Sequence, residues 1–326
     1  MSNIDMIRAA ADRLNGHARI TPLLSSPYLD EVAGRRVLVK PECLQHTGSF
    51  KYRGARSALS ALDSATRAKG VVAFSSGNHA QGVALAAREF GVPAVIIMPT
   101  DAPRLKIDNT RALGAEVVPY DRAGGENRET VSDAVLAERD LTLVKPFDEP
   151  QVIAGQGTCG LEIAAQASAL GIDQADVLVC CGGGGLTSGI ALACEADAPG
   201  LTVRPVEPEG FDDVKRSLIS GHIEANNRQS GNICDAILTP SPGQMTFPIL
   251  KRLCGPGLSV SEDDCLRAMA QAFQRLKLVV EPGGAAALAA VLFHGNEIEA
   301  GTVICTISGG NVDAEMFQRA LAVDMH

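Results

Sequence analysis

The stretch DVLVCCGGGGLTSGIALACE, residues 176–195, joins an apolar run, four consecutive glycines and an apolar helical pattern. The run at 176–181 has the composition of a buried β-strand. Residues without a Cβ let backbone N–H groups converge, and with the N-terminus of the following helix they make an anion site suited to a phosphate. A plain strand-to-helix turn is the structural alternative, but four glycines carry an entropic cost that such a turn does not require. The glycines are Gly182, Gly183, Gly184 and Gly185.

Similar apolar runs recur along the chain and alternate with helical patterns. The further strand-like runs are VVAF (71–74), AVIIM (94–98), EVVPY (116–120), TVRPVE (202–207) and TVICTIS (302–308). The helical patterns include AQGVALAAREF (80–90), RLKIDNTRALG (104–114) and ENRETVSDAVLAERD (126–140), and a capping box of Ser261 with Asp264 begins another that continues to residue 276. This alternation predicts parallel strands joined by right-handed helical crossovers, and hence a doubly wound α/β fold.

Three short segments each begin where a predicted strand ends. SSGNH (75–79) follows the strand at 71–74, the four glycines follow the strand at 176–181, and SGGN (308–311) closes the last strand. Ligands of such folds bind beyond the carboxyl ends of the strands. The sequence therefore predicts one site that is built from all three loops.

Lys51, in GSFKYRG at 48–54, is the candidate nucleophile. A lysine amine forms a Schiff base with an aldehyde cofactor once it is deprotonated, and a crowded, partly buried pocket lowers the lysine pKa enough to allow this. Most lysines are solvated surface charges, so the motif is weak by itself. The three loops at the predicted sheet edge are what give it weight.

The composition excludes several other classes of protein. The chain has 326 residues, 46% of them hydrophobic and 21% charged, which is ordinary for a soluble globular protein of one large or two modest domains. A net charge of -9 argues against nucleic acid as a partner, because binding to the phosphate backbone relies on clustered Lys and Arg.

The sequence also argues against a membrane or secreted protein. No apolar run approaches the roughly 20 residues needed to span a bilayer, and the start MSNIDMIRAAADRL lacks the apolar stretch of a signal peptide. Nine scattered cysteines show neither a disulfide framework nor a C-x-x-C zinc spacing. We therefore expect a cytoplasmic location.

Taken together and in this order, the segments resemble the fold-type II family of pyridoxal-phosphate (PLP) enzymes, in its serine/threonine dehydratase and serine racemase branch. The resemblance extends over nearly the whole chain and includes HARITPLLSSPYL (17–29), KPECLQHTGSFKYRGA (40–55), VIAGQGTCGLEI (152–163) and EPGGAAALAA (281–290). It implies a tryptophan synthase β-like fold with a large domain at 1–69 and 149–326 and a small domain at 70–148. The cofactor would lie in the cleft between them, and the protein would form a homodimer or homotetramer.

The resemblance also implies roles for residues around the cofactor. Lys51 would bind the aldehyde, Phe50 would pack against the ring, and Asn78 would hydrogen-bond the 3-hydroxyl oxygen. Ser308 would face the pyridine nitrogen, and a hydroxyl there makes the ring a weaker electron sink than a carboxylate would, which favours elimination over transamination. The phosphate would lie on the four glycines and Leu186.

SSGNH is the predicted binding site of the substrate α-carboxylate, because hydroxyls and backbone N–H groups gather there at a helix N-terminus. Its residues are Ser75, Ser76, Gly77, Asn78 and His79. A simple helix cap is the structural alternative for either serine. Ser76 matches the acid/base serine of racemases in this family, and Arg128 matches an arginine that approaches substrate carboxylates in some members, although an exposed arginine at a helix start is an equal alternative.

Glu207, the carbonyl of Phe211, and Asp213 match in spacing the divalent-cation site of the racemase-like branch. Oxygen ligands of this kind suit Mg²⁺ or Ca²⁺. Glu207 could instead be the ribose-binding acid of a dinucleotide site, but the glycines do not follow G-x-G-x-x-G and that interpretation uses neither Lys51 nor Ser308.

The predicted activity is that of an ammonia-lyase acting on a β-hydroxy amino acid, most simply L-threonine or L-serine. Serine racemisation through Lys51 and Ser76 is one alternative. Dehydration of 3-hydroxyaspartate is another, and it needs a cation for the second carboxylate, for which Arg128 is the candidate. A non-catalytic metabolite sensor would not need a nucleophile, so the retention of Lys51 argues against it.

Overall fold

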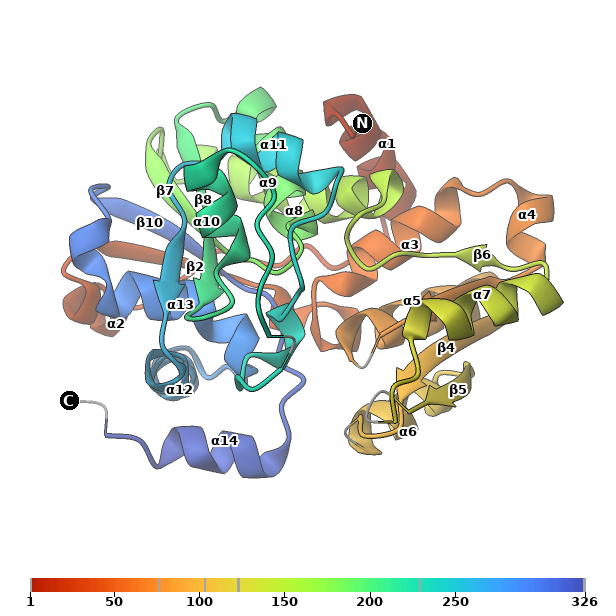
Figure 1. Cartoon of the computed structure of the whole chain (residues 1–326). Helices are drawn as coiled ribbons and strands as arrows, with labels where there is room; N and C mark the ends of the chain where they lie inside the picture. Colours follow the sequence, from red (N-terminus) through yellow and green to blue (C-terminus); the bar gives the residue numbers. More distant parts are fainter. Residues whose placement is uncertain (1, 76, 103, 122–123, 229, 325–326) are drawn as a thin grey trace.

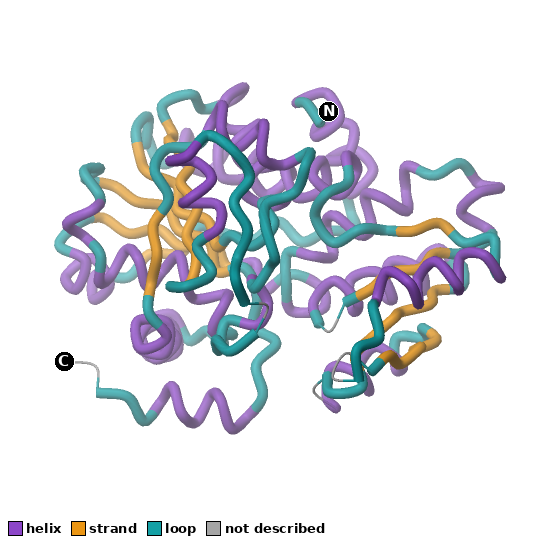
Figure 2. Tube along the Cα trace, in the orientation of Figure 1, coloured by secondary structure: helices purple, strands orange, loops and turns teal. Residues whose placement is uncertain are grey.

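The computed structural model describes residues 2–75, 77–102, 104–121, 124–228 and 230–324, apart from the side chains of Leu105, Arg128 and Glu129. Within this part of the chain the strands form two sheets, which Figure 1 and Figure 2 show as two separate groups. The six-stranded sheet has the order β1 (Leu24–Ser25), β2 (Arg36–Pro41), β10 (Thr302–Ile307), β7 (Ala175–Cys180), β8 (Leu201–Pro208), β9 (Leu258–Val260). The four-stranded sheet has the order β5 (Glu116–Tyr120), β4 (Ala94–Pro99), β3 (Val71–Phe74), β6 (Thr142–Leu143).

The pairing confirms the predicted parallel architecture. Every described strand pair is parallel except β1 with β2, where Leu24 lies opposite Val39. The six strands predicted from apolar runs are all present, each within one residue of its expected bounds. The sequence pattern did not identify β1, β2, β6 or β9, most of which are short strands at sheet edges.

The helices around the six-stranded sheet are α1 (Ile4–Leu14), α2 (Pro27–Ala33), α8 (Pro150–Ala169), α9 (Gly185–Asp197), α10 (Asp213–Ser220), α11 (Thr246–Leu253), α12 (Glu262–Gln271), α13 (Pro282–Phe293) and α14 (Ala314–Leu321). The helices with the four-stranded sheet are α4 (Ser64–Ala68), α5 (Asn78–Phe90), α6 (Arg104–Ala112) and α7 (Arg128–Glu138). Helix α3 (Lys51–Ala61) contacts both α5 and α8, so it joins the two halves of the molecule. The 3₁₀ turns are η1 (Glu42–Leu44), η2 (His46–Gly48), η3 (Asp235–Ile237) and η5 (Gly295–Glu297).

Both faces of the six-stranded sheet are buried, and residues along each strand alternate between them as the pleat requires. In β7, Val177 and Val179 pack on one face with Ile163 and Ile190 of α8 and α9. Leu178 of the same strand points to the other face, where α13 packs. A run that is apolar on both faces is therefore what a central parallel strand needs, which explains the continuous pattern in the sequence.

The predicted capping box is confirmed at the start of α12. The Ser261 hydroxyl accepts the Asp264 N–H at 3.1 Å, and the Asp264 carboxylate accepts the Ser261 N–H at 3.1 Å. The helix does not continue unchanged to residue 276, however, because a π-helical turn, η4 (Ala272–Leu276), follows Gln271 and ends at Lys277 with φ 62°.

None of the described helices combines the length and the apolar sequence that a membrane span requires.

Candidate active site

The residues predicted to hold the cofactor meet in one pocket between the two sheets. Those that line it are Phe50, Lys51, Asn78, Gly182, Gly183, Gly184, Gly185, Leu186 and Ser308. The backbone joins two of these segments directly, because the Phe50 N–H donates to the Ser308 carbonyl at 3.1 Å. Three loops that are far apart in the sequence therefore build one site at the carboxyl ends of β3, β7 and β10.

Lys51 is the first residue of α3, and its side chain is partly buried. Its ammonium donates a hydrogen bond to the Pro146 carbonyl at 2.7 Å. Burial lowers the Lys51 pKa to about 8, and the negative charge of Glu281 opposes that shift. A substantial fraction of the amine is therefore neutral just above physiological pH, which is what a nucleophile or general base requires.

Helix α3 is anchored beneath Lys51 by buried charges, which we call the Arg53 network: Lys40, Glu42, Arg53 and Glu162. Arg53 donates to Glu42 at 2.7 Å and to Glu162 at 2.6 Å, and Lys40 donates to Glu162 at 2.6 Å. The Thr21 hydroxyl donates a hydrogen bond to the Glu42 carboxylate at 2.6 Å. The Thr158 hydroxyl accepts a hydrogen bond from Arg53 at 3.1 Å. Burial alone would raise the pKa of Glu42, but Arg53 holds it below its ordinary value.

Two of the four glycines, Gly183 and Gly184, are required by what surrounds them. A Cβ at Gly183 would overlap the ring of Phe147, and one at Gly184 would lie 2.7 Å from Leu250 Cδ1 on a backbone with φ 91°. The loop leads directly into α9, so its N–H groups lie at the positive end of the helix dipole. This arrangement fits a phosphate.

Two threonines strengthen this fit. Thr187, in the first turn of α9, and Thr239 also line the pocket, and both hydroxyl oxygens are buried. Neither has a hydrogen-bond partner among the described residues, apart from a weak contact of Thr187 with the Cys181 thiol. Buried hydroxyls of this kind are costly unless a ligand satisfies them.

The predicted substrate loop is only partly at the pocket surface. Asn78 lines the pocket, whereas Ser75, Gly77 and His79 are not part of the lining given by the described residues. The Ser75 hydroxyl accepts the Gly77 N–H at 3.1 Å, as in a local turn. Ser76 and the side chain of Arg128 lie outside the described residues, so their predicted roles stay predictions.

The His79 imidazole is neutral, with one nitrogen that donates a hydrogen bond and one that can accept. Its Nε2 lies 2.9 Å from the Val144 carbonyl, which can only accept, so Nε2 must carry the proton. Burial, followed by the positive charge of Lys51, lowers the His79 pKa to about 3. Nδ1 is therefore unprotonated, and it is buried without a partner in the described structure.

Lys106 of α6 links the two halves of the molecule beside this loop. Its Nζ lies 2.9 Å from the Asp235 carboxylate of η3, and it would be 3.4 Å from a Cβ at Gly77. Its side chain is 12% exposed, so the positive charge is close to the loop and largely shielded from water. No sequence motif suggested this residue.

The predicted metal ligands Glu207 and Asp213 are both buried, 0% and 1% exposed. The Glu207 carboxylate accepts the N–H groups of Val214 and Lys215 at 2.9 and 2.7 Å, so it also caps α10. Burial and the neighbouring Asp213 charge raise the Glu207 pKa, and Asp213 Oδ2 has no partner among the described residues. Two adjacent buried carboxylates with a free oxygen fit a divalent cation, although no described group of three His, Cys, Asp or Glu side chains is placed to hold one.

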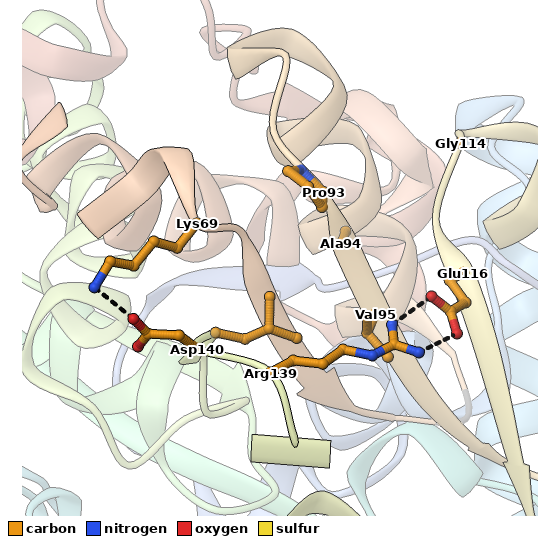
Figure 3. A pocket seen from close by; sticks show the side chains of 9 residues that line it. Lys69, Pro93, Ala94, Val95, Gly114, Glu116, Arg139 and Asp140 are labelled. Carbon is orange, nitrogen blue, oxygen red and sulfur yellow. Dashed lines mark hydrogen bonds and ion pairs between the residues drawn. The ribbon is translucent and has the colours of Figure 1, made fainter. Parts of the chain in front are cut away.

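A roomier hollow of about 420 Å³ lies at the other end of the four-stranded sheet. Figure 3 shows that its charged residues pair with each other: Lys69 with Asp140 at 2.6 Å, and Arg139 with Glu116 at 2.6 Å. It is shallow, and Asp140 raises the pKa of its one lysine, Lys69, so that this amine stays protonated. Size alone therefore does not mark the chemical site.

Comparisons with known proteins show which family the chain belongs to. The family model "Pyridoxal-phosphate dependent enzyme" matches residues 14–309. The chain is 43% identical to an L-threo-3-hydroxyaspartate ammonia-lyase from Pseudomonas sp, over 97% of each protein, and 39% identical to a serine racemase from Schizosaccharomyces pombe, over 98% of this chain and 97% of that one. A solved T.th. threonine deaminase superposes with a TM-score of 0.89 at 47% identity, covering 95% of this chain and 99% of that one. The predicted fold is confirmed, and the chain belongs to the family of pyridoxal-phosphate dependent enzymes.

Proposed function

We propose that this chain is an ammonia-lyase that converts L-threonine or L-serine to 2-oxobutyrate or pyruvate, with release of ammonia. The observation that carries the proposal is the convergence of Lys51, with its lowered pKa, on a glycine loop that fits a phosphate. When bound, the cofactor withdraws electrons from the substrate Cα–H bond and so acidifies it. Relatives named threonine and 3-hydroxyaspartate ammonia-lyases support this class of reaction.

The residues of the chain divide the remaining work. Lys51 accepts the Cα proton as general base. The Pro146 carbonyl, which accepts a hydrogen bond from the Lys51 amine, orients that amine. The glycine loop, Thr187 and Thr239 hold the phosphate, and Asn78, Phe50 and Ser308 orient the ring. The loop at 75–79 receives the substrate carboxylate at the N-terminus of α5.

Lys51→Ala tests this assignment. We expect ammonia release from threonine and serine to fall roughly 10⁴-fold, because general base and nucleophile are lost together. The absorbance of the lysine-bound cofactor should disappear as well. Turnover that persists in this variant would refute the role of Lys51.

A second candidate substrate is 3-hydroxyaspartate, which is favoured by two relatives at 43% and 40% identity and by the position of Lys106. A second substrate carboxylate needs a nearby cation, and Lys106 is one beside Gly77. Lys106→Met should then lower kcat/KM for 3-hydroxyaspartate at least roughly tenfold more than for threonine. Equal losses for both substrates would exclude Lys106 as the recognition residue.

Serine racemisation remains a further alternative, supported by relatives with that name. It would use Lys51 and Ser76 on opposite faces of the substrate. Chiral analysis of the products from L-serine separates the two activities, since only a racemase yields D-serine. Keto acid and ammonia alone would end this alternative.

We further propose a divalent cation, Mg²⁺ or Ca²⁺, at Glu207, Asp213 and the Phe211 carbonyl, supported by the two buried acids. The division into domains at 1–69 with 149–326 and at 70–148 is likewise a proposal, supported by the two sheets. A homodimer or homotetramer in the cytoplasm is the proposed working form.

A further inference from the structure

Glu281 is a buried carboxylic acid beside the cofactor residues that the sequence did not single out. It precedes α13 directly, and its side chain is 1% exposed. Oε1 accepts a hydrogen bond from Asn78 Nδ2 at 2.5 Å, while Oε2 has no partner in the described part of the chain. A buried carboxyl with a free oxygen needs an explanation, because such groups are expensive.

The hydrogen bond to Asn78 is one end of a chain of three side chains. Asn311 Nδ2 donates to Asn78 Oδ1 at 2.7 Å and to the Thr47 carbonyl at 2.8 Å. Asn78 is therefore held at its oxygen by Asn311 and at its nitrogen by Glu281. The amide cannot flip without losing both contacts, and one N–H of Asn78 remains for the cofactor.

Glycine at 309 keeps the carboxylate in place. A Cβ on Gly309 would overlap Glu281 Oε1, and the Glu281 N–H donates to the Gly309 carbonyl at 3.1 Å. Glu281 therefore lies against the turn that follows Ser308. This explains why SGGN has glycine directly after the serine.

The charges around Glu281 come from several elements. Burial is the largest influence on its pKa, which is raised to about 7; Asp235 of η3 raises it further, while Lys106 of α6 and Lys51 of α3 lower it. Cys43 of η1 also feels the Glu281 charge, which adds to the burial that raises its own pKa. Glu281 in turn raises the pKa of Lys51, against the stronger effect of burial.

We propose that Glu281 is a positioning residue with two separable roles. Its carboxyl oxygen fixes the Asn78 amide, which would donate to the cofactor. Because Asn78 and Lys51 line the same pocket, the Glu281 charge behind Asn78 also acts across that pocket on the proton of Lys51. The inference rests on the proposed roles of Lys51 and Asn78.

Two substitutions separate these roles. Glu281→Gln keeps an oxygen that can accept from Asn78 but removes the charge. Glu281→Asp keeps the charge but shortens the reach, so the hydrogen bond is lost. The full-length chain, freed of cofactor, is mixed with PLP over a range of pH, and the absorbance of the lysine-bound cofactor gives both the affinity and the pH midpoint of capture.

For Glu281→Gln we expect the pH midpoint of capture to move down by about one unit, because Lys51 loses a neighbouring negative charge. PLP affinity should stay within about threefold of the unsubstituted chain. For Glu281→Asp we expect an unmoved midpoint and an affinity roughly tenfold weaker, as for a lost hydrogen bond. The kcat profile with pH should shift in Glu281→Gln alone.

Asp176→Asn is the matched control, because Asp176 pairs with Arg204 at the opposite end of the six-stranded sheet from the pocket. It should change thermal stability without changing PLP capture. If both Glu281 variants capture PLP like the unsubstituted chain, the inference is wrong while the proposed function stands. A shared loss of affinity with an unmoved midpoint also overturns it, since that indicates only a structural role. Failure of the unsubstituted chain to bind PLP would instead defeat the proposed function.

Discussion

The Arg53 network and the cofactor pocket both bury polar groups, yet they leave those groups in different states. In the network, the side chains of Glu42 and Arg53 are 0% and 1% exposed, and Arg53 Nε lies 2.7 Å from Glu42 Oε2. In the pocket and directly beside it, Thr187, Thr239 and Glu281 each keep a buried atom without a full partner among the described residues. Helix α3 belongs to both regions, because its first turn carries Lys51 as well as Arg53. In the Arg53 network the paired charges hold the fold, whereas the unpaired atoms at the pocket lie where a bound cofactor would complete their hydrogen bonds.

The largest expected effect comes from removing a charge of the Arg53 network. Arg53→Met leaves the Glu42 carboxylate buried without its cation, and we expect the free energy of unfolding to fall by about 3–5 kcal/mol. Chemical denaturation of the cofactor-free chain measures this. The double variant Arg53→Met with Glu42→Gln should recover part of the loss, and a double variant as unstable as the single one would contradict the explanation.

The next effect concerns the proposed cation site. Mg²⁺ at about 100 times its dissociation constant should stabilise the chain by about 2.7 kcal/mol, because it binds only the folded state. Thermal melting with Mg²⁺ and with a chelator measures the difference. Asp213→Asn should remove the response, and an equal response in that variant would place the cation elsewhere.

A pair of matched threonine variants sharpens the comparison at a smaller scale. Thr239→Val removes a hydroxyl that lacks a partner, so we expect unchanged stability of the cofactor-free chain and PLP binding roughly tenfold weaker. Thr158→Val removes a hydroxyl that donates to the Gly155 carbonyl at 2.7 Å and accepts from Arg53, so we expect the reverse. Melting temperature and PLP titration are both read for each variant, and identical behaviour of the two would refute the distinction.

The smallest effect is a dependence of stability on pH. Burial raises the pKa of Glu149 to about 7 in the folded chain. The stability that this shift contributes is fully present below pH 4.5, the ordinary pKa of the group, and is lost as the pH rises through 7. Glu42 behaves oppositely: its stabilising ion pair is present above 4.5 and is lost at lower pH. Glu149→Gln should therefore flatten the decline of the melting temperature between about pH 4.5 and 7. A change confined to pH values below 4.5, where Glu42 titrates, would be inconsistent with this assignment.

The sequence predicted those features that have a local signal. Apolar runs gave β3, β7 and β10, and the loops after them gave most of the pocket lining, because strand and loop are contiguous in the chain. The capping box at Ser261 is equally local.

Contacts between distant residues had no such signal. Asn78 and Glu281 are 203 positions apart, and Lys106 meets Asp235 over 129 positions. One clue was present, since Glu281 is the only charged residue in the apolar segment LVVEPGGAAALAAVLF at 278–293. An isolated acid in a buried helix start is improbable without a partner, so that segment could have pointed to Glu281.

The ion pair between Lys106 and Asp235 has a consequence for how firmly the two halves of the molecule are held together. It links α6 to the turn η3, and its Lys106 side is 12% exposed while its Asp235 side is 51% exposed. Dissolved ions screen exposed charges strongly and partly buried charges much less. Added salt should therefore weaken this link only in part, so that much of the attraction persists in concentrated buffer.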